Sequence, residues 1–345
     1  MKVLAVLLAL LGASSGGVDI GALTKQASAL RGIPVRQPIG VRQVDRVQMR
    51  RIVLRLTAGE TDERSSARWD RALHLLGVLE SSQRLATIQH KLLTAQVAGL
   101  YDPQSKQLFV VVAQDQKPPK SVIVHEIVHA LQDQAFNLQA GAFAPNARRG
   151  DGALAAQAVV EGDATEVQSR FLTTSSSADQ LSELRVGLAQ GAAGLKGVPG
   201  FLVRGLLFPY SDGERFVAAL RARGGARLVD QAFRTPPRTT LAILDPSRFP
   251  DRDGSPVTFA KPKGRSALDE VFGAADVQAL LDSASIATAW RGGRITLRPH
   301  DLVLQLAIEH SFVDLTVAKL RKLLPRSRTT VTVQGDRITA VMTGS

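Results

Sequence analysis

Apolar residues recur every three or four positions along much of this chain, which is the spacing of a helix with one buried face. This spacing predicts helices over residues 44–56, 67–79, 85–93, 153–172, 208–220 and 226–233. Gly224 and Gly225 are predicted to separate the last two of these helices. Two short apolar runs, 96–101 and 108–112, flank turn-forming residues and predict a β-hairpin.

After residue 255 the pattern changes to shorter apolar segments. These predict strands over 257–260, 295–298 and 302–308, a helix over 312–324, and a hairpin formed by 329–333 and 336–342. The chain is therefore predicted to be α+β, with one domain over residues 18–250 and a smaller C-terminal α/β region over residues 251–345.

One predicted helix, over residues 121–134, is apolar nearly all round and is therefore expected to be buried in the middle of a domain. It contains the sequence His-Glu-x-x-His, and Ser121 is its predicted N-cap. His125 and His129 lie about 40° apart on one face, so both imidazoles can bind one metal ion. Glu126 projects about 60° from His129, where it can act as a base beside a metal-bound water. The alternative is a buried helix whose histidines are satisfied by hydrogen bonds alone.

A third ligand is predicted in the helix over residues 153–172, where Glu161 is followed by Gly162. A glycine inside a helix costs about 1 kcal/mol relative to alanine, so its presence needs a packing reason. Close approach of this helix to the His-Glu helix is one such reason, and it makes Glu161 the expected third ligand. The alternative is a solvated glutamate, since Asp163 and Glu166 show that acidic residues are common here.

Composition limits the metal ligands, catalytic groups and partners that the chain can have. The chain has 345 residues and no cysteine, which excludes Cys-ligated zinc, a thiol nucleophile and disulfides. The net charge is +12, but aromatic residues make up only 5% and are not interleaved with the basic clusters, which argues against a nucleic-acid platform. Anionic surfaces are candidate partners, and a solvated basic surface is the alternative. The sequence makes no prediction of oligomeric state.

The first residues have the pattern of a secretory signal peptide, expected over residues 1–17. Lys2 is the charged start, Val3 to Leu11 is the apolar segment, and Gly12 to Gly17 supplies small residues for cleavage. No other stretch approaches the length of a transmembrane helix. The mature protein is therefore expected to be exported, to the periplasm or the extracellular space, with no transmembrane segment.

With these motifs in place, the chain resembles the gluzincin zinc metallopeptidases, and most closely a group of exported bacterial HExxH proteins. The resemblance rests on the segments 96–103, 125–134, 160–164 and 209–217, with weaker matches at 236–240 and 290–294. It implies a zincin-like core, in which a β-hairpin or sheet packs on the active-site helix and the Glu-bearing helix. It also implies Zn²⁺ held by His125, His129 and Glu161, with Glu126 as the base. Two features depart from the family: 31 residues separate His129 from Glu161, and Asp245 stands where relatives would carry histidine.

The expected activity is that of a zinc metallopeptidase acting on peptides or proteins, in which Glu126 moves the proton of the attacking water. The hairpin before the metal helix is expected to pair with an extended substrate. Tyr210 is the expected catalytic donor to the developing oxyanion, and His300 is a weaker candidate. Asp133 and Thr165 are candidate hydrogen-bond partners of the ligands. Two alternatives stay open: a non-catalytic zinc-binding or partner-binding protein of the same fold, and a zinc hydrolase of non-peptide bonds.

Overall fold

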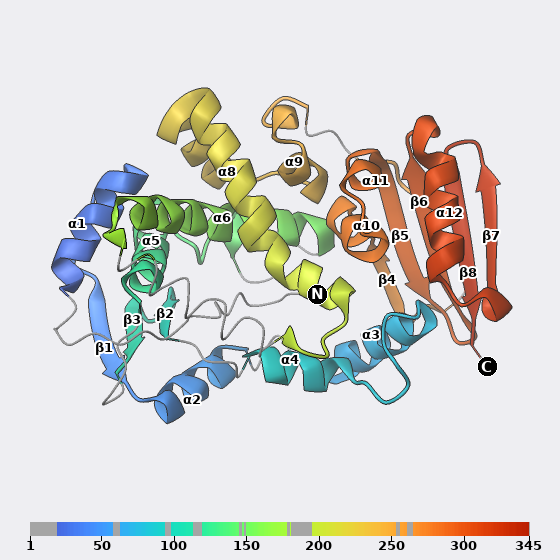
Figure 1. Ribbon diagram of the computed structural model, residues 1–345, viewed down its shortest axis with the longest axis horizontal. Helices are drawn as coiled ribbons and strands as arrows, with labels where there is room; N and C mark the ends of the chain where they lie inside the picture. Colours follow the sequence, from blue (N-terminus) through green and yellow to red (C-terminus); the bar gives the residue numbers. More distant parts are fainter. Residues whose placement is uncertain are drawn as a thin grey trace.

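The computed structural model is α+β, with a small sheet at one end, a larger sheet at the other and long helices between them (Figure 1). The structure describes residues 19–57, 63–93, 98–112, 119–144, 147, 150–177, 180, 195–252, 256–260 and 265–344. The expected signal peptide over residues 1–17 lies outside this range. Within the described part of the chain, none of the helices combines the length and apolar character needed to cross a bilayer.

The small sheet has three strands in the order β1-β3-β2, and its elements come from the first third of the chain. Its strands are β1 (Gly40–Val44), β2 (Gly99–Asp102) and β3 (Gln107–Val111). The predicted hairpin is confirmed, because β2 and β3 pair antiparallel, with Leu100 opposite Phe109. β1 adds to the other side of β3 in parallel. β2 is therefore an edge strand.

The helices of this part of the chain are α1 (Ile20–Arg31), α2 (Arg46–Thr57), α3 (Glu63–Leu75) and α4 (Leu85–Leu93).

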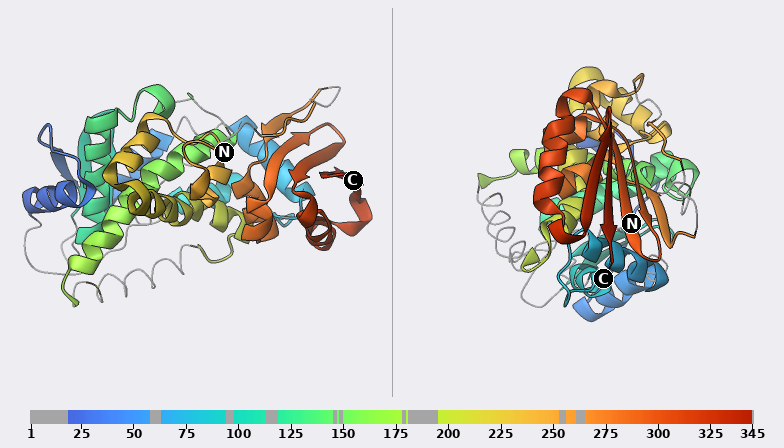
Figure 2. Two further views of the ribbon diagram at one scale, coloured as in Figure 1. Left: turned by 90° about the horizontal axis from the view of Figure 1, so that it is seen from above. Right: turned by 90° about the vertical axis from the view of Figure 1, so that its right-hand side faces the viewer.

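Three long helices form the centre of the molecule: α5 (Lys120–Phe136), α6 (Gly150–Thr174) and α8 (Gly200–Arg234). α5 contacts the small sheet on one side and α6 on the other, while α8 crosses α6 (Figures 1 and 2). The helix predicted from 208 in fact begins at Gly200, and Pro209 lies inside it. Packing explains this: Phe201, Leu202 and Phe208 continue the buried face, which offsets the roughly 3 kcal/mol cost of an internal proline. The predicted break at Gly224 and Gly225 is confirmed by their non-helical backbone angles.

The glycine at 162 has a different packing partner from the expected one. A Cβ built on Gly162 would overlap the backbone of Gly213 on α8, and a Cβ on Gly213 would overlap the carbonyl of Ala158 on α6. The closest helix approach at this point is therefore between α6 and α8, not between α6 and the His-Glu helix α5. Two glycines face each other because no side chain fits between the two backbones.

The larger sheet lies at the C-terminal end and has the strand order β4-β5-β6-β8-β7, with every neighbouring pair antiparallel. Its strands are β4 (Leu268–Val271), β5 (Trp290–Leu297), β6 (Asp301–Ile308), β7 (Thr329–Gln334) and β8 (Arg337–Thr343). The predicted terminal hairpin and the predicted strand over 302–308 are confirmed. The predicted strand over 257–260 is not formed; in that segment Val257 donates one backbone hydrogen bond to Arg291. Figure 2 shows α12 (Val313–Leu323) lying along this sheet.

The core of the larger sheet includes side chains from far earlier in the chain. Trp69, Leu73 and Leu76, at α3 and its end, share one buried cluster with Leu304 of β6 and Ile338 of β8. The short helices α9 (Thr240–Leu244), α10 (Ala274–Leu281) and α11 (Ala284–Thr288) connect the central helices to this sheet. The polypeptide therefore contributes to the C-terminal core twice, once before the His-Glu helix and once after it.

Candidate metal centre

Helix α5 carries the His-Glu-x-x-His sequence through the interior, as expected from its apolar surround. His125 and Glu126 are buried with relative exposures of 0% and 3%, and His129 is partly buried. The predicted cap is wrong: the helix starts at Lys120 with Pro119 as the N-cap residue, so Ser121 lies inside the first turn. Proline has no side-chain acceptor, so the first N–H groups of the helix receive no hydrogen bond from the side chain of the N-cap residue.

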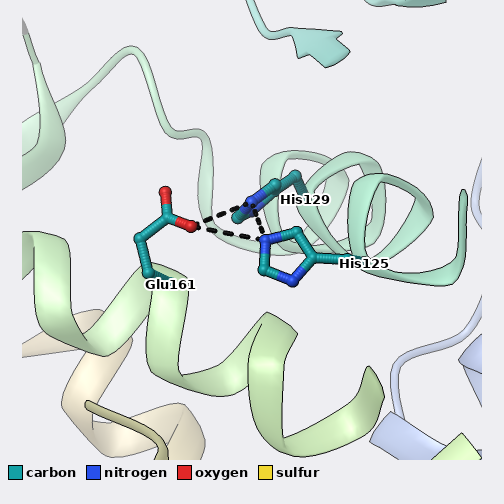
Figure 3. A group of neighbouring side chains, drawn as sticks. All are labelled: His125, His129 and Glu161. Carbon is teal, nitrogen blue, oxygen red and sulfur yellow. Dashed lines mark hydrogen bonds and ion pairs between the residues drawn. The ribbon is translucent and has the colours of Figure 1, made fainter. Parts of the chain in front are cut away.

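The expected third ligand, Glu161, comes from α6 and points at the two histidines (Figure 3). The Nε2 atoms of His125 and His129 are 3.0 Å apart. Glu161 Oε2 lies 3.3 Å from His125 Nε2 and 3.5 Å from His129 Nε2. These three side chains form a group that can hold a metal ion. The structure therefore places the three predicted ligand residues next to one another, although the close approach that Gly162 allows is to α8 and not to α5.

The donor distances fit a small tetrahedral cation. With metal–ligand bonds of about 2.0–2.1 Å, tetrahedral angles place neighbouring donor atoms about 3.3–3.4 Å apart. The three observed separations of 3.0, 3.3 and 3.5 Å bracket this value. Two imidazoles and one carboxylate are also a donor set that suits zinc.

Without a metal, the Glu161 carboxylate forms buried ion-pair contacts with the two histidines. Burial by itself would lower the pKa of His129, but the negative charge of Glu161 outweighs it and raises that pKa to about 9. Burial would likewise raise the pKa of Glu161, but His129 and His125 lower it to about 2. A cation that binds between them would replace the proton on His129.

The histidines are oriented by two glutamines, which the sequence reasoning did not find. His129 Nδ1 lies 3.0 Å from Gln132 Oε1, and His125 Nδ1 lies 3.1 Å from Gln168 Oε1. Where the glutamine presents its carbonyl oxygen to the ring, it accepts a hydrogen bond from Nδ1 and leaves Nε2 for a metal. The two glutamines lie three residues after His129 on α5 and seven residues after Glu161 on α6, and a systematic check of amides one or two turns from the ligands would have found them.

The two residues expected in this role contact other groups. Asp133 accepts from the hydroxyl of Tyr101 at 2.7 Å, from Lys106 at 2.6 Å and from the backbone N–H of Leu138 at 3.0 Å. Thr165 donates to the backbone carbonyl of Glu161, not to its carboxylate. Asp133 therefore fastens the β2-β3 hairpin to α5, and the expectation that it would bind a ligand histidine is not met.

Glu126, the expected base, is not part of the three-donor group but lies beside it, and its charge contributes to the raised pKa of His129. Its Oε2 accepts a 2.7 Å hydrogen bond from the backbone N–H of Tyr101 on β2. A Cβ built on Gly99, also on β2, would lie 3.2 Å from Glu126 Cγ. The outer edge of β2 thus runs directly past this carboxylate.

Tyr210 of α8 lies next to the same group, with its ring centroid 6.2 Å from that of His125. Its hydroxyl oxygen is buried and makes no hydrogen bond of standard geometry with the described residues, but it lies close enough to Glu161 to interact with that carboxylate. Burial, together with the charges of Glu161 and Glu126, raises the pKa of Tyr210 well above its ordinary value, so the hydroxyl keeps its proton. The weaker candidate, His300, is exposed in the turn between β5 and β6, on the other sheet.

The described residues thus define an α+β protein in which two histidines and a glutamate form a metal-binding group, with a buried carboxylate and a buried phenol beside it. No family model, no curated protein and no solved structure is significantly similar to the chain.

Proposed function

We propose that this protein is an exported zinc metallopeptidase of the gluzincin type, with a zincin-like core formed by the small sheet, α5 and α6. The observation that carries the proposal is the combination of a three-donor group with Glu126, a buried carboxylate left outside that group. A purely structural metal site has no use for such a carboxylate. Zn²⁺ bound here would supply a water whose pKa is lowered to about 7 and a Lewis acid for the substrate carbonyl.

Residues of the chain itself carry out the proton transfer, stabilise the oxyanion and bind the substrate. The Glu126 carboxylate takes a proton from the attacking water and passes it to the leaving amine. The Tyr210 hydroxyl, protonated and buried beside Glu161, donates to the oxygen on which negative charge develops. The outer edge of β2 offers backbone groups beside Glu126, where an extended peptide can add as a further strand.

The first test combines zinc content with peptide cleavage in three proteins: wild type, Glu161→Ala and Glu126→Gln. Wild type should hold one zinc per chain and cleave unstructured peptides. Glu161→Ala should lose most of its zinc, because it removes one of three protein ligands. Glu126→Gln should keep its zinc and lose about 10²- to 10⁴-fold in cleavage rate, the usual contribution of a general base.

Each alternative predicts a different result. A non-catalytic metal-binding protein would show zinc in wild type and in Glu126→Gln with no cleavage by either. A zinc hydrolase of non-peptide bonds would cleave ester or amide model substrates in a Glu126-dependent way and leave peptides intact. Absence of zinc from wild-type protein would remove the proposal altogether.

A further inference from the structure

Gln132 lies at the centre of a buried hydrogen-bond network behind the metal-binding group. It is on α5, fully buried, and three residues after His129. Its Oε1 lies 3.0 Å from His129 Nδ1. Its Nε2 lies 3.0 Å from the backbone carbonyl of Val160 and 3.0 Å from Asp163 Oδ2, both on α6. The two contacts of Nε2 join the helix that carries the two histidines to the helix that carries the glutamate, while the contact with His129 lies within α5.

The partners on α6 determine which way the Gln132 amide points. A carbonyl and a carboxylate can only accept hydrogen bonds, so the amide end that faces them has to be the NH₂ group. The oxygen end is then forced toward His129, where it can only accept a hydrogen bond from the Nδ1–H group. Nδ1 is thereby kept as the hydrogen-bond donor, and Nε2 is the nitrogen that can exchange its proton for a cation. The orientation follows from the donor and acceptor chemistry of the neighbours, independently of how amide atoms are assigned.

Asp163 is itself held in place by charge. Arg31 of α1 donates to Asp163 Oδ2 at 2.6 Å, and both side chains are fully buried. The same guanidinium contacts Asp230 of α8 at 2.9 Å, and Arg221 of α8 lies 3.7 Å from Asp163 Oδ1. A carboxylate paired with these guanidinium groups is a fixed acceptor.

We propose that Asp163, acting through Gln132, is a positioning residue that sets the tautomer and ring orientation of His129. The inference rests on the proposed zinc site. Among the described residues, His125 has a partner whose orientation is less constrained. The Gln168 amide that faces His125 has Ser121 Oγ behind it at 3.4 Å, and a hydroxyl can donate or accept, so it does not determine the amide's direction.

Two substitutions of Gln132 separate positioning from a merely structural role, because they have opposite effects on metal and on fold. Gln132→Met keeps the volume and removes the acceptor at His129; zinc should bind about 10- to 100-fold more weakly. Gln132→Glu keeps an acceptor at His129 but sets a second carboxylate against Asp163. It should lower the thermal stability of the metal-free protein more than Gln132→Met does, while zinc affinity stays within about threefold of wild type.

Gln134→Met is the matched control, since Gln134 is on the same helix and its amide bonds to residues 36 and 37 instead. Zinc dissociation constants, the visible spectrum of the Co²⁺-loaded proteins, and melting temperatures of the metal-free proteins would be measured for all four chains. The expected pattern includes a changed Co²⁺ spectrum in Gln132→Met and unchanged spectra in Gln132→Glu and Gln134→Met.

The results that overturn the inference differ from those that overturn the zinc site. If wild type binds zinc and Gln132→Met binds it equally tightly, the positioning role is wrong and the zinc site stands. A tenfold or larger loss of zinc affinity in Gln132→Glu would also overturn the positioning role. If Gln132→Met does not fold, the zinc affinity of Gln132→Glu alone tests this role. If wild type itself binds no zinc or Co²⁺, the proposed function fails first.

Discussion

At the scale of single residues, His129 and Glu161 have a relationship that depends on whether a metal is present. In the metal-free protein they form an ion pair, since the pKa of His129 is raised to about 9 and that of Glu161 is lowered to about 2. Zinc requires His129 unprotonated, so the cation competes with a proton for the same nitrogen. Metal uptake and pH are therefore coupled.

This coupling predicts the pH dependence of stability. The raised pKa of His129 gives stability that is complete below its ordinary value of 6.5 and is lost as pH rises through about 9. Metal-free protein should therefore unfold at progressively lower temperature across this interval. Zinc-loaded protein should not show this loss, because the metal takes the place of the proton. Calorimetry of both forms over this range tests the prediction, and parallel curves would contradict it.

Tyr210 gives a second prediction at this scale. Tyr210→Phe removes only the buried hydroxyl, so zinc content and melting temperature should change little. The cleavage rate should fall about 10²- to 10³-fold, the usual effect of losing one donor to an oxyanion. His300→Ala is the control, since His300 is exposed and belongs to the other sheet. Equal activity of Tyr210→Phe and wild type would leave the tyrosine with a packing role only.

Individual residues also show where sequence reasoning stops. Helical spacing singled out His125 and His129, and Gly162 drew attention to Glu161, although this glycine in fact packs against α8. Gln168 could not be predicted, because it reaches His125 from another helix, 43 residues away in sequence. Gln132 and Asp133 lie three and four residues after His129, but only Gln132 contacts this histidine, while Asp133 faces the hairpin.

At the scale of elements, the crossing of α6 and α8 places two parts of the site relative to each other. Glu161 immediately precedes Gly162, and Tyr210 lies three residues before Gly213. Because these two glycines are in backbone contact, the third ligand and the phenol are fixed to the same crossing point. A change in the separation of the two helices would move both groups together.

Gly162→Ala tests this arrangement. Its methyl group would overlap the backbone of Gly213, so the helices have to separate and stability should fall by about 1–3 kcal/mol, with a loss of zinc affinity. Gly205→Ala is the matched control on α8, because nothing lies within 4 Å of the added Cβ. It should be neutral or stabilising by up to about 1 kcal/mol. Denaturant unfolding of both variants measures the difference, and equal stabilities would contradict the close-contact argument.

Elements with strong local signals were predictable, and those determined by distant packing were not. α4 matches the predicted range 85–93, and the turn residues before Gln107 correctly indicated the β2-β3 hairpin. The start of α8 was missed because Pro209 is locally unfavourable within a helix and only its buried neighbours compensate. β4 was missed because it is only four residues long and has no regular apolar alternation.

At the scale of the whole molecule, one group of exposed basic residues lies on and beside the small sheet. Arg42 on β1 and Arg51 and Arg55 on α2 are exposed, and α2 contains no acidic residue. Val47, also on α2, is 61% exposed. A basic helix face with an exposed apolar residue suits an anionic surface such as lipid headgroups.

Binding to vesicles tests this. Wild type should sediment with vesicles containing anionic lipid, less so as salt concentration rises, and not with neutral vesicles. Replacing Arg42, Arg51 and Arg55 with glutamine should weaken binding, at about 1 kcal/mol for each charge close to the surface. The same substitutions at Arg321 and Arg326, in the C-terminal part, are the control. Equal binding to neutral and anionic vesicles would contradict an electrostatic surface.

Arg31 forms ion pairs with two residues that are far from it in sequence and are therefore synthesised much later. Its two carboxylate partners lie 132 and 199 residues further along. During synthesis from the N-terminus, the two histidines and Glu161 emerge well before Asp230 does. The three residues proposed to bind the metal are thus synthesised while Arg31 still lacks one of its two carboxylate partners. A ribosome-bound chain that ends between Glu161 and Asp230 should therefore bind zinc less tightly than the full chain.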